Sequence, residues 1–133
     1  MRIRKIECAN GHMRMNLNKV KGFHKWVEAL RSDKFKQAKD KLGSCEGGFC
    51  CLGVGNHIQT GKKDFFEARM PDKKTRASSW LAGVNDDIYS SVDGLDKFKV
   101  FSLACLNDRL DLTFQEIADC LEAVYIHGVL DKV

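Results

Sequence analysis

The sequence predicts a mainly α-helical fold, organised as one domain over residues 1–133 with about four or five helices. Three observations predict it: a length and a hydrophobic fraction of 44% that suit one globular core, apolar residues that repeat with helical periodicity, and a helix-start motif near the end of the chain. An α+β fold with a small hairpin in the middle segment is the alternative.

The first periodic segment predicts an amphipathic helix over residues 18–31. Its apolar residues follow the spacing of one helical face, and they are Val20, Phe23, Val27 and Leu30. Asn16 or Asn18 is expected to cap this helix through its side-chain oxygen. The preceding basic residues lack clear periodicity, and a short strand is expected at Ile3–Ile6.

A second helix is expected directly after the first, with Ser32 or Asp33 as its cap. Gly43 supplies a C-terminal stop for this helix. Its narrow apolar stripe consists of Phe35, Ala38 and Leu42. The two helices would then be neighbours that carry most of the basic residues of the chain.

The segment 49–59 begins with a run that is apolar on all sides, so we expect it to be buried. Periodicity alone does not separate helix from strand in so short a run. A helix that ends near Gln59 is favoured, because apolar residues repeat at every fourth position. These residues are Cys50, Val54 and Ile58.

Residues 62–93 show no consistent periodicity. Pro71, the only proline in the chain, excludes a continuous helix there. The apolar pairs Phe65–Phe66 and Trp80–Leu81 stand in an otherwise polar stretch. We expect a short hairpin or an ordered loop that packs on the core.

Regular patterns return in the last third of the chain. The spacing of apolar residues predicts a helix over residues 95–107. Residues 113–116 then form a capping box, with Thr113 as the N-cap and Glu116 as the third helical residue. The helix that follows is expected to bury Ile117, Cys120, Leu121 and Val124.

Charge is distributed unevenly along the chain, whose formal net charge is +4. Residues 1–42 contain 12 lysines and arginines against 4 acidic residues, whereas residues 77–133 contain 4 against 10. The basic part would attract an acidic partner or phosphate, unless the acidic end of the same chain is that partner. The residues expected to form the binding surface are Lys25, Arg31, Lys34, Lys36, Lys39 and Lys41.

The six cysteines are expected to be reduced thiols, as in a cytoplasmic protein. The sequence has no run of about 20 apolar residues that would span a membrane. Its basic start, Met1–Lys5, is not followed by the apolar stretch of a signal peptide. Cys105 and Cys120 stand on apolar helical faces and are expected in the core.

Thiol chemistry and zinc binding are weakly supported alternatives. A Cys50 or Cys51 nucleophile with His57 as its base would need a low thiol pKa, which an apolar run opposes. Four residues have side chains that zinc prefers, without the C-x2-C spacing of common zinc sites: Cys8, His12, Cys45 and Cys50. The sequence therefore assigns no catalytic residue, no metal ligand and no cofactor.

Several separated blocks of the sequence resemble a family of small, mostly uncharacterised proteins encoded by tailed bacteriophages. The blocks are Lys25–Ser32, Phe35 with Gln37, Gly48–Val54, Leu106–Asp108 and Phe114–Asp119, and Phe49–Val54 is the most specific. The resemblance implies a protein made in the cytoplasm of an infected bacterium. It implies no catalytic residue and no cofactor.

By analogy with small phage accessory proteins, the expected function is binding, with inhibition or sequestration of a host defence protein or a signalling nucleotide. A nucleic-acid-associated phage protein that uses basic helices over residues 19–41 is the second hypothesis. A thiol- or metal-dependent enzyme is the third. No membrane partner is expected, and the sequence predicts no oligomeric state.

Overall fold

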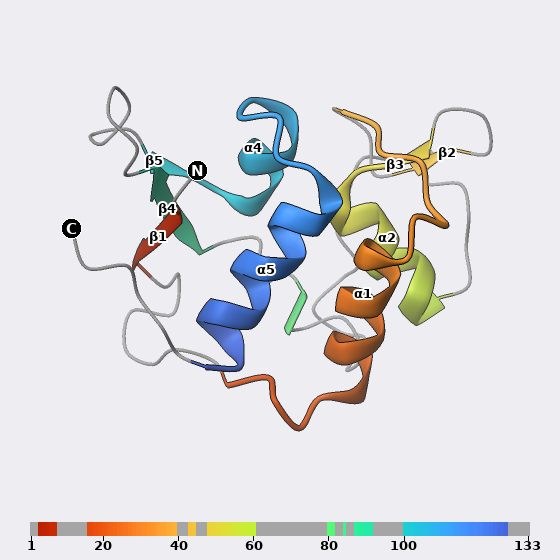
Figure 1. Ribbon diagram of the computed structural model, residues 1–133, viewed down its shortest axis with the longest axis horizontal. Helices are drawn as coiled ribbons and strands as arrows, with labels where there is room; N and C mark the ends of the chain where they lie inside the picture. Colours follow the sequence, from red (N-terminus) through yellow and green to blue (C-terminus); the bar gives the residue numbers. More distant parts are fainter. Residues whose placement is uncertain are drawn as a thin grey trace.

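Two helices that are far apart in the sequence form the centre of the fold, α1 (Lys21–Arg31) and α5 (Phe114–Tyr125), which pack side by side (Figure 1). The mainly α-helical fold predicted from the sequence is confirmed. The computed structural model describes residues 3–7, 16–39, 43–44, 48–60, 80–81, 84, 87–91 and 100–127.

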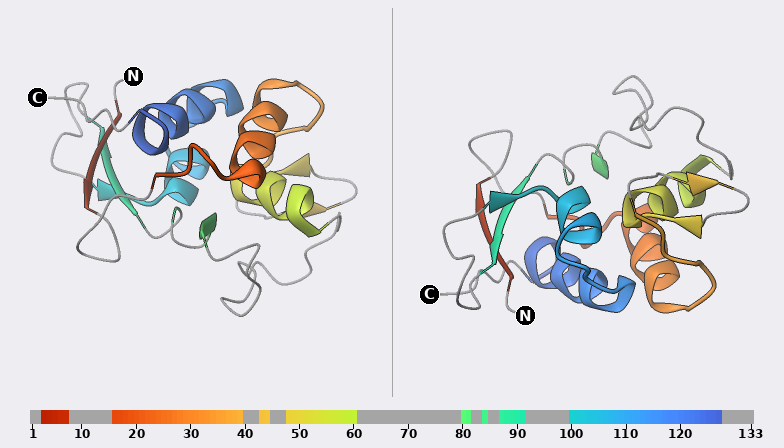
Figure 2. Two further views of the ribbon diagram at one scale, coloured as in Figure 1. Left: turned by 90° about the horizontal axis from the view of Figure 1, so that it is seen from below. Right: turned by 90° about the horizontal axis from the view of Figure 1, so that it is seen from above.

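The arrangement has three parts along the long axis of the molecule. A small three-stranded sheet lies at one end, α1 and α2 (Cys51–Thr60) lie at the other, and α5 lies between them with α4 (Leu103–Asp108), as both views in Figure 2 show. Contacts of α1 with α5 and with α2, and of α4 with α2 and α5, hold the helices together.

The core is centred on Phe23 of α1. Its ring centroid lies 6.1 Å from that of Trp26 and 6.1 Å from that of Tyr125, in edge-to-face geometry. All three side chains are buried. Because full burial of a large apolar side chain contributes about 1.5–3 kcal/mol, this contact holds α1 and α5 firmly together.

Helix α1 starts later than the sequence predicts. Its N-cap is Val20, which has no side-chain bond to the helix, because the expected caps serve the preceding turn: Asn16 Oδ1 accepts a bond from the Asn18 N–H at 3.0 Å. The buried face of α1 matches the periodicity and consists of Phe23, Trp26, Val27, Ala29 and Leu30.

The second expected helix, from Ser32 or Asp33 to Leu42, is wrong within residues 32–39. Asp33 has φ +59°, so it ends α1 as a left-handed residue after the Ser32 C-cap and does not start another helix. The segment instead pairs with β3 (Gly48–Phe49). Gly43, expected as a helix stop, belongs to β2 (Gly43–Ser44), which is antiparallel to β3.

The helical interpretation of residues 49–59 is confirmed by α2. Its glycines allow a close approach of neighbouring elements: a Cβ on Gly55 would lie 3.0 Å from Leu81 Cδ1 and 3.3 Å from the Trp26 ring. The Trp26 Nε1–H also donates to the Cys51 carbonyl at 2.8 Å. α1 and α2 are thus joined by close packing and by a buried hydrogen bond.

The sheet joins a strand near the start of the sequence to two strands within residues 88–101. Strand β1 (Ile3–Glu7) confirms the strand expected at Ile3–Ile6, and it lies antiparallel to the central strand β4 (Ile88–Ser91). β4 falls in the middle segment, where a hairpin was expected. Its partners are β1 and β5 (Val100–Phe101), so the observed pairing reaches beyond that segment.

The helix expected over residues 95–107 is shorter than predicted. Val100–Phe101 is strand β5, and the helix α4 begins at Leu103, because the Ser102 hydroxyl caps it by accepting from the Cys105 N–H at 3.4 Å. Residues 95–99 lie outside the described part of the chain. Phe101 therefore packs on the core from a strand and not from a helix.

The capping box at the start of α5 is confirmed. Thr113 Oγ1 accepts from the Glu116 N–H at 3.1 Å, and Glu116 Oε1 accepts from the Thr113 N–H at 3.1 Å. The helix then buries Ile117, Ala118, Leu121 and Val124, whereas Cys120 is only half-buried against the core. Cys105, also expected in the core, is half-buried as well.

The substitution Thr113→Ala is expected to lower the free energy of unfolding by about 1 kcal/mol, because a helix N–H loses its acceptor. Glu116→Ala should cost less, since it leaves the cap bond from the Thr113 hydroxyl to the helix N–H in place. Urea denaturation followed by circular dichroism measures both changes. An unchanged midpoint for Thr113→Ala would show that this cap does not hold α5.

Candidate functional site

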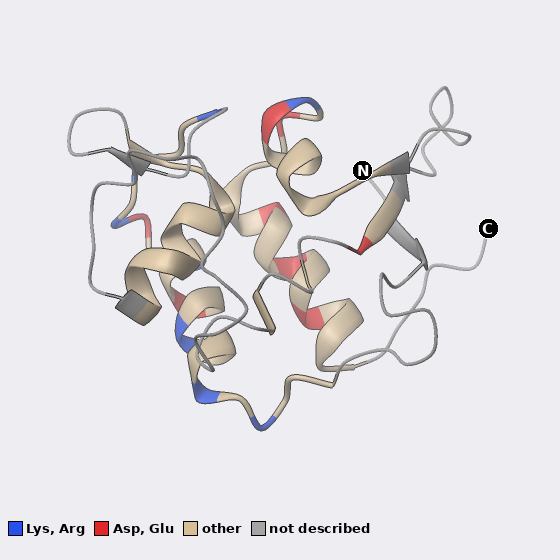
Figure 3. Ribbon diagram, turned by 180° about the vertical axis from the view of Figure 1, so that it is seen from behind, with Lys and Arg blue, Asp and Glu red and all other residues tan. Residues whose placement is uncertain are grey.

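The predicted basic residues divide into two groups, and the first is neutralised within the chain. Arg31 at the end of α1 contacts two acidic residues of α5: its guanidinium lies 2.6 Å from Glu122 Oε1 and 2.6 Å from Asp119 Oδ1. The bond from Arg31 holds the pKa of Glu122 below its usual value. Lys39 forms a second ion pair with Asp111. Figure 3 shows acidic positions along α5 and basic positions on α1 and the segments that flank it.

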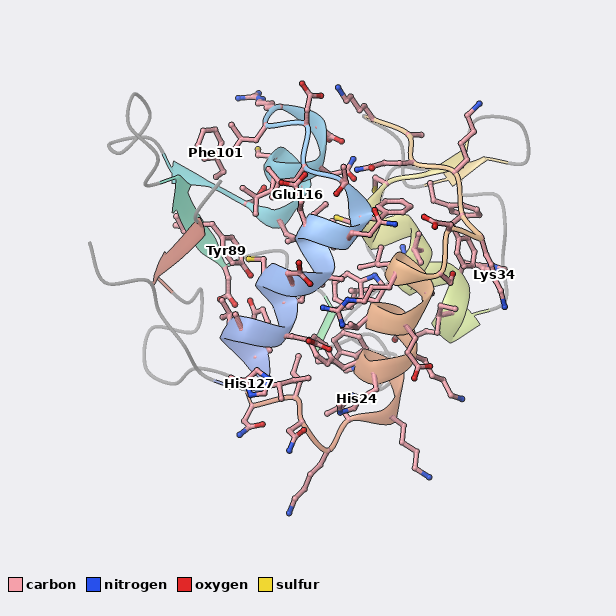
Figure 4. All side chains as sticks on the ribbon, viewed as in Figure 1. His24, Lys34, Tyr89, Phe101, Glu116 and His127 are labelled. Atoms are coloured by element: carbon pink, nitrogen blue, oxygen red, sulfur yellow. The ribbon has the colours of Figure 1, made fainter. Side chains whose placement is uncertain are left out.

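The second group is exposed: Lys25, Lys34 and Lys36. None of the three forms an ion pair with another residue in the part of the chain that the structure describes. Lys34 projects from the outer edge of the molecule on the side of α2 (Figure 4). Lys41, the sixth predicted residue, lies outside the described residues.

Three aromatic rings form a half-buried cluster next to Lys34 and Lys36. Phe35 meets Phe49 and His57 edge-on, at centroid distances of 5.6 and 5.5 Å. Phe49 and His57 are stacked at 5.6 Å with an interplanar angle of 29°. The rings come from the segment after α1, from β3 and from α2, and each keeps part of its surface exposed.

Backbone pairing holds the ring cluster and the lysines together. The Phe49 N–H donates to the Lys36 carbonyl at 2.8 Å, and the Ala38 N–H donates to the Phe49 carbonyl at 2.7 Å. Gly48 permits this approach: it has φ +83°, and a Cβ built on it would lie 3.1 Å from Lys36 Cβ. The Lys36 side chain therefore starts directly over Gly48, beside Phe49.

Asn107 anchors this surface to the core. Its buried Oδ1 accepts from Gln37 Nε2 at 2.8 Å and from the Cys51 N–H at 3.3 Å. Its Nδ2 donates to the Ala38 carbonyl at 2.9 Å. One side chain of α4 thus fixes both the paired segment and the first turn of α2. No sequence pattern indicates this role, since an asparagine near a helix end is usually a surface residue.

The geometry opposes the thiol-nucleophile hypothesis. Cys50 and Cys51 are buried, and burial raises the pKa of both thiols, so the reactive thiolate is disfavoured. The ring of His57 stacks on Phe49. Cys50, Cys51 and Cys105 form no disulfide with another described residue, and the reduced state of all six cysteines stays a prediction.

The zinc hypothesis rests mostly on residues that are not described. Cys8, His12 and Cys45 lie outside the described residues, and Cys50 is the one candidate ligand that the structure places. Among the described residues, no three histidine, cysteine or acidic side chains are grouped as metal ligands would be.

A second polar cluster lies in the core between β4 and α5. The hydroxyls of Tyr89 and Tyr125 are 2.6 Å apart, and the Tyr125 hydroxyl donates to the buried carboxylate of Asp87. Burial raises the pKa of both tyrosines. With all three side chains almost fully buried, the cluster ties the sheet to the helices. The sequence analysis did not single out any of these residues.

The fold and this surface define a small α-rich domain with a lysine-and-aromatic face. The chain belongs to the DUF8296 family, described as a domain of unknown function, whose model matches residues 15–82. The matched range contains the ring cluster together with Lys34 and Lys36. Neither a curated protein nor a solved structure matches the chain. Among the described helices, none is long and apolar enough to cross a membrane.

Proposed function

We propose that this protein acts by binding and not by catalysis, as a phage-encoded accessory protein that inhibits or sequesters a negatively charged host protein or signalling nucleotide. The proposed contact is the face formed by Lys34, Lys36 and the rings of Phe35, Phe49 and His57, called the lysine–ring face below. One observation carries the proposal: these two lysines stay exposed, whereas Arg31 and Lys39 are paired with acidic side chains of the chain itself.

This difference between the lysines supports a partner outside the chain. The acidic residues of the C-terminal part could have neutralised all the basic positions, but the described ion pairs reach only Arg31 and Lys39. Lys34 and Lys36 have Phe35 between them, and its ring is half-buried. Exposed charges beside partly exposed rings suit an interface, since aromatic residues are enriched in interfaces.

The phage origin rests on the resemblance of the sequence blocks. Three of these blocks build the proposed face, because Phe35 with Gln37 and Gly48–Val54 form its two paired segments and Leu106–Asp108 contains the Asn107 anchor. A binding role without chemistry also agrees with the buried, high-pKa thiols of Cys50 and Cys51.

The test is capture of partners from bacterial lysate by the immobilised protein, with proteins and nucleotides identified by mass spectrometry. We expect Lys34→Glu combined with Lys36→Glu to lose the captured partner and to keep the fold, because both side chains are exposed. Circular dichroism checks the fold.

A matched control separates the site from the total charge. Lys19→Glu combined with Lys21→Glu changes the net charge equally, and both positions are exposed. They lie before and at the start of α1, whereas Lys34 and Lys36 follow its end, and the helix between them has 11 residues and a length of about 16 Å. This control should keep the partner. Equal loss in both double variants would mean that overall charge, and not the proposed face, governs binding.

A further inference from the structure

We propose that the occupant of the lysine–ring face is single-stranded nucleic acid, whose bases stack on the rings while its phosphates meet Lys34 and Lys36. This inference rests on the proposed binding role of the face but goes beyond its partners: it assigns the face to the nucleic-acid-associated hypothesis, with neither a host protein nor a free nucleotide as the occupant. It joins two independent observations, the three-ring cluster and the lysines that the described ion pairs leave exposed.

The ring cluster supplies the stacking part of the interaction. Phe35, Phe49 and His57 lie within 5.6 Å of one another by their centroids, so together they form one contiguous cluster of rings. None of them is fully buried, in contrast to Phe23 and Trp26 in the core. An unpaired base has a flat π-face and stacks on such rings without regard to its identity.

The lysines supply the phosphate part. Lys34 and Lys36 bracket Phe35 in the sequence, and Lys36 starts beside Phe49 because its Cβ lies over Gly48. A nucleotide strand repeats a base and a phosphate at every unit, so it can place bases on the rings and successive phosphates near both ammonium groups. An acidic protein could contact both the lysines and the rings, but it does not repeat a flat base and a phosphate at every unit.

The exposure of the face favours a strand over the other nucleotide ligands. A free nucleotide binds tightly where a pocket covers most of its surface, whereas these lysines are exposed and the three ring-bearing residues are only partly buried. A strand makes several weak contacts that add together. A duplex keeps its bases stacked inside the helix and offers no base face to the rings.

The experiment compares two oligonucleotides of about 15 nucleotides by fluorescence anisotropy, an oligothymidine and an abasic strand with the same backbone charge. The unmodified protein should bind oligothymidine at least about tenfold more tightly, since every base that stacks on an aromatic ring adds to the affinity. This comparison needs no variant, so it remains informative whatever substitutions do to the fold.

Variants then locate the contact. Phe35→Leu retains apolar volume but removes the ring, and it should reduce the preference for oligothymidine over the abasic strand. Lys34→Glu combined with Lys36→Glu should weaken both ligands, and Lys19→Glu combined with Lys21→Glu should weaken neither comparably.

Several results would overturn the inference. Equal affinity for the two strands would leave only charge attraction, and equal affinity for a duplex would exclude stacking of unpaired bases. Displacement of the strand by low concentrations of ATP or a cyclic dinucleotide would identify a free nucleotide as the occupant. Absence of strand binding, with a lysine-dependent partner captured from lysate, would reject this inference and leave the proposed function standing.

Discussion

Replacement of Asn107 by alanine is expected to lower the free energy of unfolding by about 3–5 kcal/mol. The side chain is buried, and its amide joins two segments at once, one through Gln37 and Ala38 and the other through Cys51. Alanine would leave the Cys51 N–H and the Ala38 carbonyl without these partners. Each buried polar group left in this way typically costs about 1–3 kcal/mol.

Urea denaturation monitored by tryptophan fluorescence measures this change, because Trp26 bonds to Cys51 in the affected turn. Asn18→Ala is a suitable control: its side chain is exposed, and the substitution should change stability by less than about 0.5 kcal/mol. A loss below about 1 kcal/mol for Asn107→Ala would mean that water replaces the amide, and that Asn107 is not the anchor described above.

Replacement of Gly48 by alanine is expected to destabilise the protein by about 2–4 kcal/mol. The backbone has φ +83°, which side chains other than glycine rarely adopt, and the new Cβ would lie 2.4 Å from the Lys36 carbonyl oxygen. The segment around Lys36 and strand β3 must separate to relieve this contact. Their backbone bonds, which hold Phe49 against Phe35, would then weaken.

Gly22→Ala offers the matched control, since its Cβ would meet only the Trp80 ring at an ordinary 3.4 Å. Located in α1, this substitution should be neutral or slightly stabilising, because alanine favours helix. Thermal unfolding compares the two variants. Equal melting temperatures for Gly48→Ala and the unmodified protein would contradict the close approach of Lys36 to Gly48.

Helices α1 and α5 could be predicted from the sequence because their signals are local. The apolar periodicity of α1 is set by residues at most four positions apart, and the capping box of α5 lies within residues 113–116. Both patterns persist in the fold because the predicted apolar faces meet each other in the core. The prediction therefore needed no knowledge of tertiary contacts.

The segment after α1 shows where local signals fail. Its lysines and its apolar stripe both favour helix, and lysine is a good helix former. The left-handed Asp33 and the pairing with β3 decide its conformation, and the partner strand lies more than ten residues away. The same reason explains the wrong start of the helix expected over 95–107, where pairing with β4 makes Val100–Phe101 a strand.

The candidate site was only partly predictable. Composition pointed to the basic residues, but it could not separate those that pair within the chain from those that do not. Arg31 pairs with Glu122, which lies 91 positions away, whereas Lys34 stays exposed. No pattern in the sequence indicates the ring cluster, because Phe35, Phe49 and His57 belong to three different segments of the chain. Only the tertiary structure brings them within stacking distance.

The packing of α1 on α5 also governs when the chain can fold during its synthesis. Phe23 and Arg31 find Tyr125 and Glu122 only once the last helix has left the ribosome. Until then, α1 can pack on α2, but the part of its apolar face that meets α5 stays uncovered. The contact that completes the core therefore forms late in synthesis, and this apolar surface is open to aggregation until α5 arrives.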